Sequence, residues 1–534
     1  MTKNYTRRDV LKGSLFGMAG AAALGLSGCA PSAPAQASAE NGTAMSETGG
    51  YHGVETEMTL NDAAYDVDVV IVGSGAAGMA ATVEAAENGL NTLLIEASSG
   101  FGGTTQFAEG ILGVNTPLQQ QLGVTNSIEE MVKGELVFSN YTVDPRLIRG
   151  FLEEADEDIQ WLRDHGVQFY DVIGGLTQHL YVDQGKQMIA ALEETARKAG
   201  ATMLLSTRGK RLFMENGCVT GILAEGDDGE FAIGAKAVVL ACGGYIQNED
   251  MMSSMLRFDT KRIKVTAAPN HEGDDITMVY AAGGDQSGIT TLHFIWAGLE
   301  SFDLHSQLST AACNEPFFMV NESGVRFCDE SLLCIGGANK GPSLFCNPIM
   351  NQKRAFSILS QGEVDRIASE GCTVGWGSYI FAGTPLDDLQ NQLDEAAANP
   401  PAGFWTAATL DELAEKLEVD GATLAAEVKK YNGFVAEGAD GDYFKDAHYL
   451  REVGDGPYYA FELMCNAFAT MGGIRVNERG EVLDGDHNAI PGLYNAGISC
   501  SGLQGTTYCP LLGGGAQGYA VFSGRNCIRS IQEA

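Results

Sequence analysis

The chain has 534 residues, a formal net charge of −36 and 45% hydrophobic residues. This length allows several domain equivalents with buried cores and excludes a small disulfide-stapled scaffold. The negative charge argues against nucleic acid or an anionic membrane surface as the main partner, because proteins that follow phosphates need a basic face.

The N-terminal residues have the pattern of a twin-arginine export signal. Arg7 and Arg8 precede an apolar run, rich in Ala and Gly, at residues 15–26. The four residues that end at Cys29 resemble a lipobox, in which this cysteine carries the lipid. We therefore expect residues 1–29 to be a twin-arginine signal with a lipobox.

Two further expectations follow for the location of the protein. Residues 30–60 are rich in Ala, Ser, Gly and Glu and lack an apolar period, which predicts a flexible linker. With a lipid anchor at Cys29, the protein would be periplasmic or on the outer face of the cytoplasmic membrane. An ordinary leader cleaved after Ala37 is the alternative.

A strand, a glycine-rich turn, a helix and a second strand follow in order. Residues 67–72 are apolar and β-branched, residues 79–88 are Ala-rich, and the apolar run 92–95 ends at Glu96. This order is typical of a Rossmann-type site, where turn glycines let amides approach a pyrophosphate and the acid accepts hydrogen bonds from a ribose. The residues predicted to bind a dinucleotide here are Gly73, Gly75, Ala76, Ala77, Gly78 and Glu96.

Six further segments carry a family resemblance. They are GGTT (102–105), VVLACGG (238–244), GDD (273–275), VNESGVRFCDE (320–330), TMGG (470–473) and GLYNAG (492–497). In this order they resemble the flavoproteins that include fumarate reductases, succinate dehydrogenases, aspartate oxidases and 3-ketosteroid dehydrogenases. The resemblance covers about residues 65 to 530.

The resemblance implies FAD and an α/β fold. It implies a Rossmann-type FAD-binding domain (61–289 and 469–534) interrupted by an α+β capping domain that holds the substrate (290–468). A helix after the last glycine run would point its N-terminus at the flavin, and Ile498 stands where the family usually has an acid. The cofactor-binding residues added in this way are Gly102, Gly103, Thr104, Thr105, Gly110, Asp274, Gly497, Leu512, Gly513, Gly514, Gly515 and Ala516.

The catalytic positions of fumarate reductases are matched only in part. Cys334 stands at the position of the proton-donating arginine, Ala469 at that of a carboxylate-binding histidine, and Leu511 at that of a second arginine. A site without these cations offers nothing to offset the desolvation of a dicarboxylate. We therefore expect that fumarate is not the preferred substrate.

Three residues are the candidates for catalysis. His293 corresponds to a histidine early in the family's capping domain, and Cys334 could act as an acid. Tyr508 lies close to the position of a tyrosine that, in ketosteroid dehydrogenases, hydrogen-bonds the substrate ketone, so its phenol could polarise a carbonyl. Tyr508 and Cys334 could equally be structural core residues.

Metal binding is not predicted. Cys334 lies in a group with Cys313, Cys328 and Cys346 that could ligate an iron–sulfur cluster, but the spacing matches no ferredoxin pattern. We favour structural roles for the group, whereas for Cys334 alone both roles stay open.

The expected function is that of an exported FAD-dependent oxidoreductase acting on CH–CH groups, as in anaerobic respiration. It would reduce a C=C bond conjugated to a carbonyl or carboxyl group in a small organic acceptor. Electrons would come from a separate donor, such as a membrane-linked cytochrome or flavoprotein. A 3-ketosteroid dehydrogenase-type flavoprotein and a non-catalytic flavin electron carrier are the alternatives.

Overall fold

The computed structural model describes residues 58–173, 177–334, 342–376, 380–509 and 511–534. The predicted export signal, the predicted lipid anchor at Cys29 and residues 30–57 of the predicted linker lie outside these residues. Residues Thr59–Ala534 form one compact unit. In the described part of the chain, no helix combines the length and the apolar character needed to cross a bilayer.

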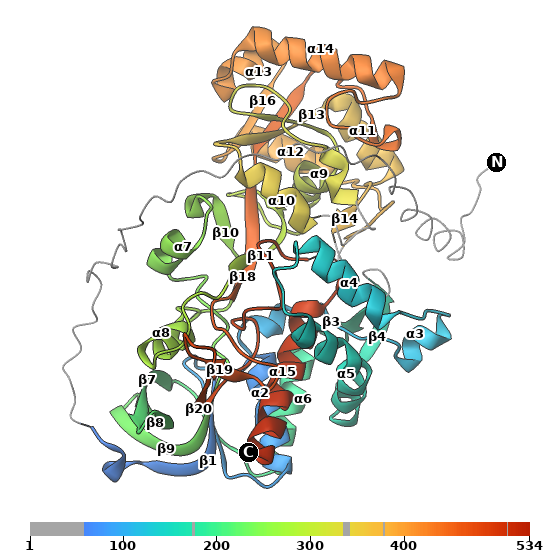
Figure 1. Cartoon of the computed structure of the whole chain (residues 1–534). Helices are drawn as coiled ribbons and strands as arrows, with labels where there is room; N and C mark the ends of the chain where they lie inside the picture. Colours follow the sequence, from blue (N-terminus) through green and yellow to red (C-terminus); the bar gives the residue numbers. More distant parts are fainter. Residues whose placement is uncertain (1–57, 174–176, 335–341, 377–379, 510) are drawn as a thin grey trace, which may run out of the picture. The chain divides into compact units, whose positions relative to one another are not determined.

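A mixed sheet of eight strands, counted over the described residues, forms the base of this unit (Figure 1). Its central strands, β1 and β9, are parallel to each other, and β2, β6 and β20 run in the same direction. The strands are β19 (Glu481–Leu483), β20 (Ala489–Asn495), β9 (Gly229–Leu240), β1 (Tyr65–Val72), β2 (Thr92–Ile95) and β6 (Thr202–Leu204), with β7 (Arg208–Glu215) and β8 (Cys218–Gly226) paired beside β9.

The sheet combines distant parts of the sequence. β19 and β20 follow residue 469, whereas the other six strands precede residue 289. Strands from both predicted parts of the FAD-binding domain therefore share one sheet. The apolar, β-branched residues of β1 are buried on both faces, as expected for a central parallel strand.

Two helices from opposite ends of the described chain lie side by side (Figure 1). They are α2 (Ala76–Glu87), drawn in blue, and α15 (Gly515–Glu533), drawn in red. A Cβ atom added to Gly524 would lie 2.1 Å from the Ala77 carbonyl oxygen, so the glycine permits the close approach. Arg525 adds a buried ion pair to Glu84, at 2.9 Å.

A second group of elements lies between the sheet strands β2 and β20 in sequence, and its members α5, α6 and β3 pack against α2 or α15. It contains a small antiparallel sheet in the order β3-β5-β4. The elements are β3 (Gly110–Leu112), α3 (Pro117–Gln121), α4 (Ile128–Phe138), α5 (Pro145–Asp164), β4 (Phe169–Ile173), β5 (Gln178–Tyr181), α6 (Gln184–Lys198), α7 (Glu249–Met255) and α8 (Asp274–Ala281).

The segment predicted as the capping domain contains its own antiparallel sheet, in the order β12-β13-β17-β16. A three-stranded sheet in the order β10-β18-β11 adjoins it in sequence. The elements are β10 (Ile263–Val265), β11 (Thr290–Gly298), α9 (Gln307–Asn314), β12 (Phe318–Asn321), α10 (Pro342–Met350), β13 (Ala355–Ser360), α11 (Gln361–Glu370), β14 (Gly375–Trp376), β15 (Ile380–Phe381), α12 (Leu389–Ala398), β16 (Phe404–Ala407), α13 (Leu410–Leu417), α14 (Gly421–Glu437), β17 (Tyr458–Glu462) and β18 (Met464–Gly472).

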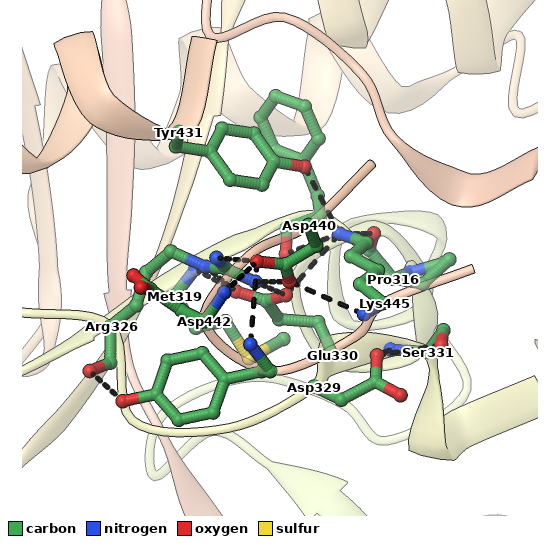
Figure 2. Close-up of polar contacts among 12 residues, drawn as sticks. Pro316, Met319, Arg326, Asp329, Glu330, Ser331, Tyr431, Asp440, Asp442 and Lys445 are labelled. Carbon is green, nitrogen blue, oxygen red and sulfur yellow. Dashed lines mark hydrogen bonds and ion pairs between the residues drawn. The ribbon is translucent and has the colours of Figure 1, made fainter. Parts of the chain in front are cut away.

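A buried ionic cluster fixes the segment 320–330 inside this part of the chain (Figure 2). The Arg326 guanidinium pairs with Glu330, at 2.8 Å, and with Asp440, at 3.0 Å. The Lys445 ammonium lies 3.3 Å from the Glu330 carboxylate and donates to the Tyr431 hydroxyl, at 3.1 Å. Two cations thus face two carboxylates, which is how a protein keeps buried charges paired. The charged residues Arg326 and Glu330 of this segment therefore have a structural role.

The α/β class predicted from the sequence is confirmed. The helix predicted at residues 79–88 begins three residues earlier, at Ala76, because the glycine turn itself forms the helix start. The predicted strand 92–95 coincides with β2.

Candidate functional site

A pocket lies at the carboxyl ends of four parallel strands, β1, β2, β9 and β20. Its lining includes the residues that directly follow these strands, namely Gly73, Glu96, Ala241 and Ala496. The carboxyl ends of parallel strands meet at one edge of a sheet, and ligands of such folds bind there. The fold therefore places the glycine turns and Glu96 around one cavity.

Two helix N-termini open onto this pocket. Helix α2 has Gly75 as its N-cap and α15 has Gly514, and neither has a side-chain cap. The first N–H groups of a helix lack partners within it and carry positive partial charge. Ala77 and Gln517, in the first turns of the two helices, line the pocket. The two helix N-termini therefore allow the pocket to bind a phosphate and a second electron-rich group.

The glycines of the first turn are required by close backbone contacts. A Cβ atom at Gly73 would lie 2.5 Å from the Ala241 carbonyl oxygen, and one at Gly78 would lie 1.8 Å from the Gly73 carbonyl oxygen. A Cβ atom at Gly75 would meet nothing closer than the Thr105 hydroxyl, at 3.6 Å. Gly73 and Gly78 thus hold the turn against its neighbours, while Gly75 leaves space in front of the helix.

The Glu96 carboxylate is held in place by three hydrogen bonds. Ser74 donates to Oε2 from its backbone N–H, at 2.9 Å, and from its hydroxyl, at 2.6 Å. Ser98 N–H donates to Oε1, at 2.8 Å. This buried carboxylate still has lone pairs for a sugar hydroxyl, which fits the ribose role predicted for it. Ser74 is a partner that the sequence pattern did not indicate.

The described residues fit FAD: two helix N-termini without a side-chain cap from the N-cap residue, a glycine-rich turn and a fixed carboxylate share one pocket. Gly102 lies behind the surface, where its N–H donates to the Ser74 hydroxyl at 3.0 Å. Gly78 and Gly515 are also outside the lining. Among the predicted cofactor residues, those that line the pocket are Gly73, Gly75, Ala76, Ala77, Glu96, Gly103, Thr104, Thr105, Gly110, Asp274, Gly497, Leu512, Gly513, Gly514 and Ala516.

Two residues that line the pocket, His271 and Arg208, were not predicted from the sequence. His271 contacts the Thr104 hydroxyl through Nε2, at 2.9 Å, and burial lowers its pKa. Arg208 pairs with Asp274 at 2.8 Å. The position of His271 close before the GDD segment was the one signal available, whereas Arg208 lies in a strand without any motif.

The other end of the pocket is aromatic. The rings of His293 and Tyr508 are stacked, and Phe468 meets His293 edge-on at a centroid distance of 5.8 Å. Phe294 and Trp296 also line this pocket. Burial lowers the pKa of His293 to about 4, so its ring is neutral at ordinary pH. The structure thus brings together two of the three predicted catalytic residues.

The hydroxyl of Tyr508 is oriented by the start of α15. The backbone N–H of Ala516 lies toward this oxygen, so the phenolic O–H can donate to another group. Burial raises the pKa of Tyr508, so the phenol stays protonated. The arrangement suits a residue that polarises an oxygen of a bound molecule.

Cys334 does not join the other two predicted catalytic residues. It ends the short helix η4 (Glu330–Cys334), it is absent from the described lining of the pocket, and it lies beside Tyr449. Burial raises the pKa of the Cys334 thiol to about 12. Glu330, at the start of the same short helix, is held in the ionic cluster of Figure 2. This anchoring fixes the position of Cys334.

The cysteines of this region show no metal site. Cys313, Cys328 and Cys346 are buried thiols. Across the described ranges, no group of three or more His, Cys, Asp or Glu side chains could hold a metal ion. The iron–sulfur alternative therefore has no support from the described residues.

The aromatic end of the pocket has little cationic charge. Among the described residues that line the pocket, Arg208 is the only Lys or Arg, and it is paired with Asp274. Ala469 and Ile498 line the pocket, and Leu511 is outside the described lining. The positions to which the family resemblance assigns charged side chains thus hold neutral residues, of which Ala469 and Ile498 line the pocket.

Comparison with known proteins agrees with this geometry. The model of the FAD binding domain family matches residues 68–510. Vinyl phenol reductase of Lactiplantibacillus plantarum is 36% identical over 477 residues, which are 86% of this chain and 95% of that protein. Fumarate reductase (cytochrome) of Shewanella frigidimarina is 27% identical over 496 residues, which are 88% of this chain and 78% of that protein.

A solved structure shows the same fold over most of the chain. The 3-ketosteroid Δ4-(5α)-dehydrogenase of Rhodococcus jostii has a TM-score of 0.67 at 25% identity, and the match covers 89% of this chain and 98% of that one. The chain therefore belongs to the FAD binding domain family, as a fumarate-reductase-like, FAD-dependent oxidoreductase acting on CH–CH groups.

Proposed function

We propose that this protein reduces the C=C bond of a small, planar and uncharged acceptor, conjugated to a carbonyl group or to a phenol ring. The observation that carries the proposal is the aromatic end of the pocket, where His293 and Tyr508 are stacked and His293 is neutral. A planar conjugated molecule packs well on such a surface. Vinyl phenol reductase, at 36% identity, supports a reaction of this kind.

Electrostatics favours an uncharged acceptor over a dicarboxylate. A buried carboxylate needs a charge-assisted partner, and the one Lys or Arg in the described lining is already paired with Asp274. A carbonyl or phenol oxygen needs only a neutral donor. Tyr508 provides this donor with its O–H group. When bound, FAD supplies the hydride, while Tyr508 stabilises the negative charge that develops on the acceptor oxygen.

The test is reoxidation of the reduced flavin. The protein is reduced photochemically without oxygen and mixed with 4-vinylphenol, a small enone, urocanate and fumarate. We expect fast reoxidation by 4-vinylphenol or by the enone and slow reoxidation by fumarate. Fastest reoxidation by fumarate would overturn the proposal, and so would bleaching of the oxidised flavin by a saturated ketosteroid with no response to any alkene.

We also propose that the protein is exported and receives electrons from a separate donor. The arginine pair at residues 7 and 8 and the lipobox that ends at Cys29 support export, and a single dinucleotide-binding pattern supports an external donor. Cell fractionation tests the first part: lysines in place of Arg7 and Arg8 should retain the protein in the cytoplasm. Unchanged export of this double variant would contradict the twin-arginine signal.

A further inference from the structure

A buried acid lies behind the aromatic end of the pocket. Glu135, on α4, is 0% exposed, and neither of its carboxylate oxygens has a hydrogen-bond partner among the described residues. The polar group beside this carboxyl is the thiol of Cys509. A buried carboxyl without a charged partner lowers the stability of the fold, so its presence suggests a function.

The cations of α4 and of the first turns of α5 are engaged in other ion pairs. On α4 itself, Lys133 binds Glu129 at the exposed surface, with Nζ 2.6 Å from the carboxylate. On α5, which packs beside α4, Arg146 pairs with Asp144 and Arg149 pairs with Glu153. From the segment before α15, the titratable groups that face Glu135 are Cys509 and Tyr508. No cation of the described residues therefore neutralises this carboxyl.

Cys509 connects the buried acid to the pocket. It is 1% exposed, and it lines the pocket next to Tyr508 in the sequence. Its backbone N–H donates to the Gln504 side chain, at 2.7 Å, which fixes its position. The other thiol in the described lining, Cys242, donates to the Val72 carbonyl oxygen at the glycine-turn end. Cys509 is therefore the thiol that the fold places at the aromatic end.

We propose that Cys509 donates the proton that completes C=C reduction and that Glu135 restores it. This assignment rests on the proposed function. The S–H bond of Cys509 breaks as a C–H bond forms at the acceptor carbon that does not receive the hydride. The O–H bond of Glu135 then breaks and the S–H bond is re-formed, after which the carboxylate takes a proton from solvent. Hydride and proton together saturate the alkene, so atoms and electrons balance.

The pH dependence follows from the burial of Glu135. Burial raises its pKa to about 7, so the carboxyl carries its proton below this pH and loses it above. Turnover of the wild-type protein should therefore fall as the pH rises through about 7. Removing the titrating group should remove this fall.

The experiment compares four variants of the FAD-loaded protein with the acceptor that reoxidises the wild type fastest. They are Glu135→Gln, Cys509→Ala, Cys509→Ser and the control Glu315→Gln. Glu315 is also buried with a pKa raised to about 7, but it contacts Thr373 and Arg366 and is outside the described lining of the pocket. Flavin content and thermal unfolding show that each variant folds.

For Glu135→Gln we expect a first turnover close to the wild-type rate, followed by turnover that is roughly 10- to 100-fold slower and flat with pH. Cys509→Ala should lose the first turnover as well, Cys509→Ser should recover part of it, and Glu315→Gln should retain the wild-type profile. Infrared spectroscopy gives a readout without substrate: a protonated carboxyl band that titrates near pH 7 should be present in the wild type and absent in Glu135→Gln.

Two failures are distinguishable. If no acceptor reoxidises the wild-type flavin, the proposed function and this assignment fall together. If the wild type turns over and Glu135→Gln keeps its rate and pH profile, or Cys509→Ala keeps its rate, this assignment alone is overturned. A missing carboxyl band near pH 7 overturns the role of Glu135 whatever the acceptor is.

Discussion

The imidazole ring of His293 is stacked on the phenol ring of Tyr508, with ring centroids 4.0 Å apart and ring planes inclined by 30°. His293 comes from β11 and Tyr508 from the segment that leads into α15, so the contact joins parts of the chain that are far apart in sequence. Because the imidazole is neutral, the pair forms an uncharged aromatic surface. The phenolic hydroxyl of Tyr508 can donate a hydrogen bond from this surface.

A single substitution at Tyr508 can distinguish the packing of its ring against the acceptor from the polarisation of the acceptor by its hydroxyl. Tyr508→Phe keeps the ring and removes the hydroxyl, so we expect acceptor binding to be retained and turnover to fall by about 100-fold or more. Steady-state kinetics, read as kcat and KM separately, checks this. Tyr449→Phe is the matched control, because its hydroxyl contacts Cys334 outside the described lining. An unchanged kcat in Tyr508→Phe would show that the hydroxyl has no part in the reaction.

The contact between α2 and α15 predicts a defect in FAD binding from a distant residue. Gly524→Ala places a Cβ atom 2.1 Å from the Ala77 carbonyl oxygen, so the two helices must move apart. Both helices direct their N-termini at the pocket, and we expect FAD affinity to fall by at least about tenfold. The loss is measured as the release of flavin on dilution, which is monitored by flavin fluorescence.

Gly433→Ala is the control for this substitution. Gly433 lies in the exposed part of α14, and a Cβ atom there meets nothing within 4 Å. This variant should keep its FAD and gain about 0.5–1 kcal/mol of stability, because alanine is the better helix former. Equal FAD affinity in both variants would refute the proposed coupling.

The FAD end of the site could be predicted largely from sequence, because local chemistry determines it. A tight turn needs Gly73 whatever the rest of the chain does, and Glu96 stands at the end of a strand that periodicity identifies. These signals are local in sequence. The structure accordingly places most of the predicted residues around one pocket.

The catalytic end could be predicted less well, because its residues meet only in the folded chain. Cys334 and Cys509 are both cysteines near a family position, and no periodicity separates the one fixed beside Tyr449 from the one that lines the pocket. Glu135 lies on an ordinary amphipathic helix, and only tertiary packing removes its partners. The buried cluster around Arg326 was likewise interpretable only once Asp440 and Lys445 were placed.

This cluster predicts a strong dependence of stability on one acid. Glu330→Gln leaves Arg326 and Lys445 facing a single carboxylate, that of Asp440, so one buried positive charge is uncompensated. We expect the free energy of unfolding to fall by about 3–5 kcal/mol. Glu412→Gln, which breaks the exposed pair with Lys416, should leave unfolding unchanged. Equal urea midpoints for the two variants would contradict the structural role of the cluster.

The buried carboxyl of Glu135 makes a prediction that depends only on the folded chain. Its pKa is raised by burial from the ordinary 4.5 to about 7, so between these pH values the folded state holds a proton that the unfolded state releases. Stability therefore falls as the pH rises through this window, and the full cost of about 3 kcal/mol is present above about pH 7. Glutamine carries no charge at any pH, so Glu135→Gln should be more stable than the wild type at pH 8. The two proteins should converge near pH 4, where both states of the wild type are protonated.

Urea unfolding at both pH values measures the difference, and Glu153→Gln, at the exposed pair with Arg149, should show no such pH dependence. A difference between Glu135→Gln and the wild type that does not change with pH would mean that Glu135 is ionised in the folded protein at neutral pH.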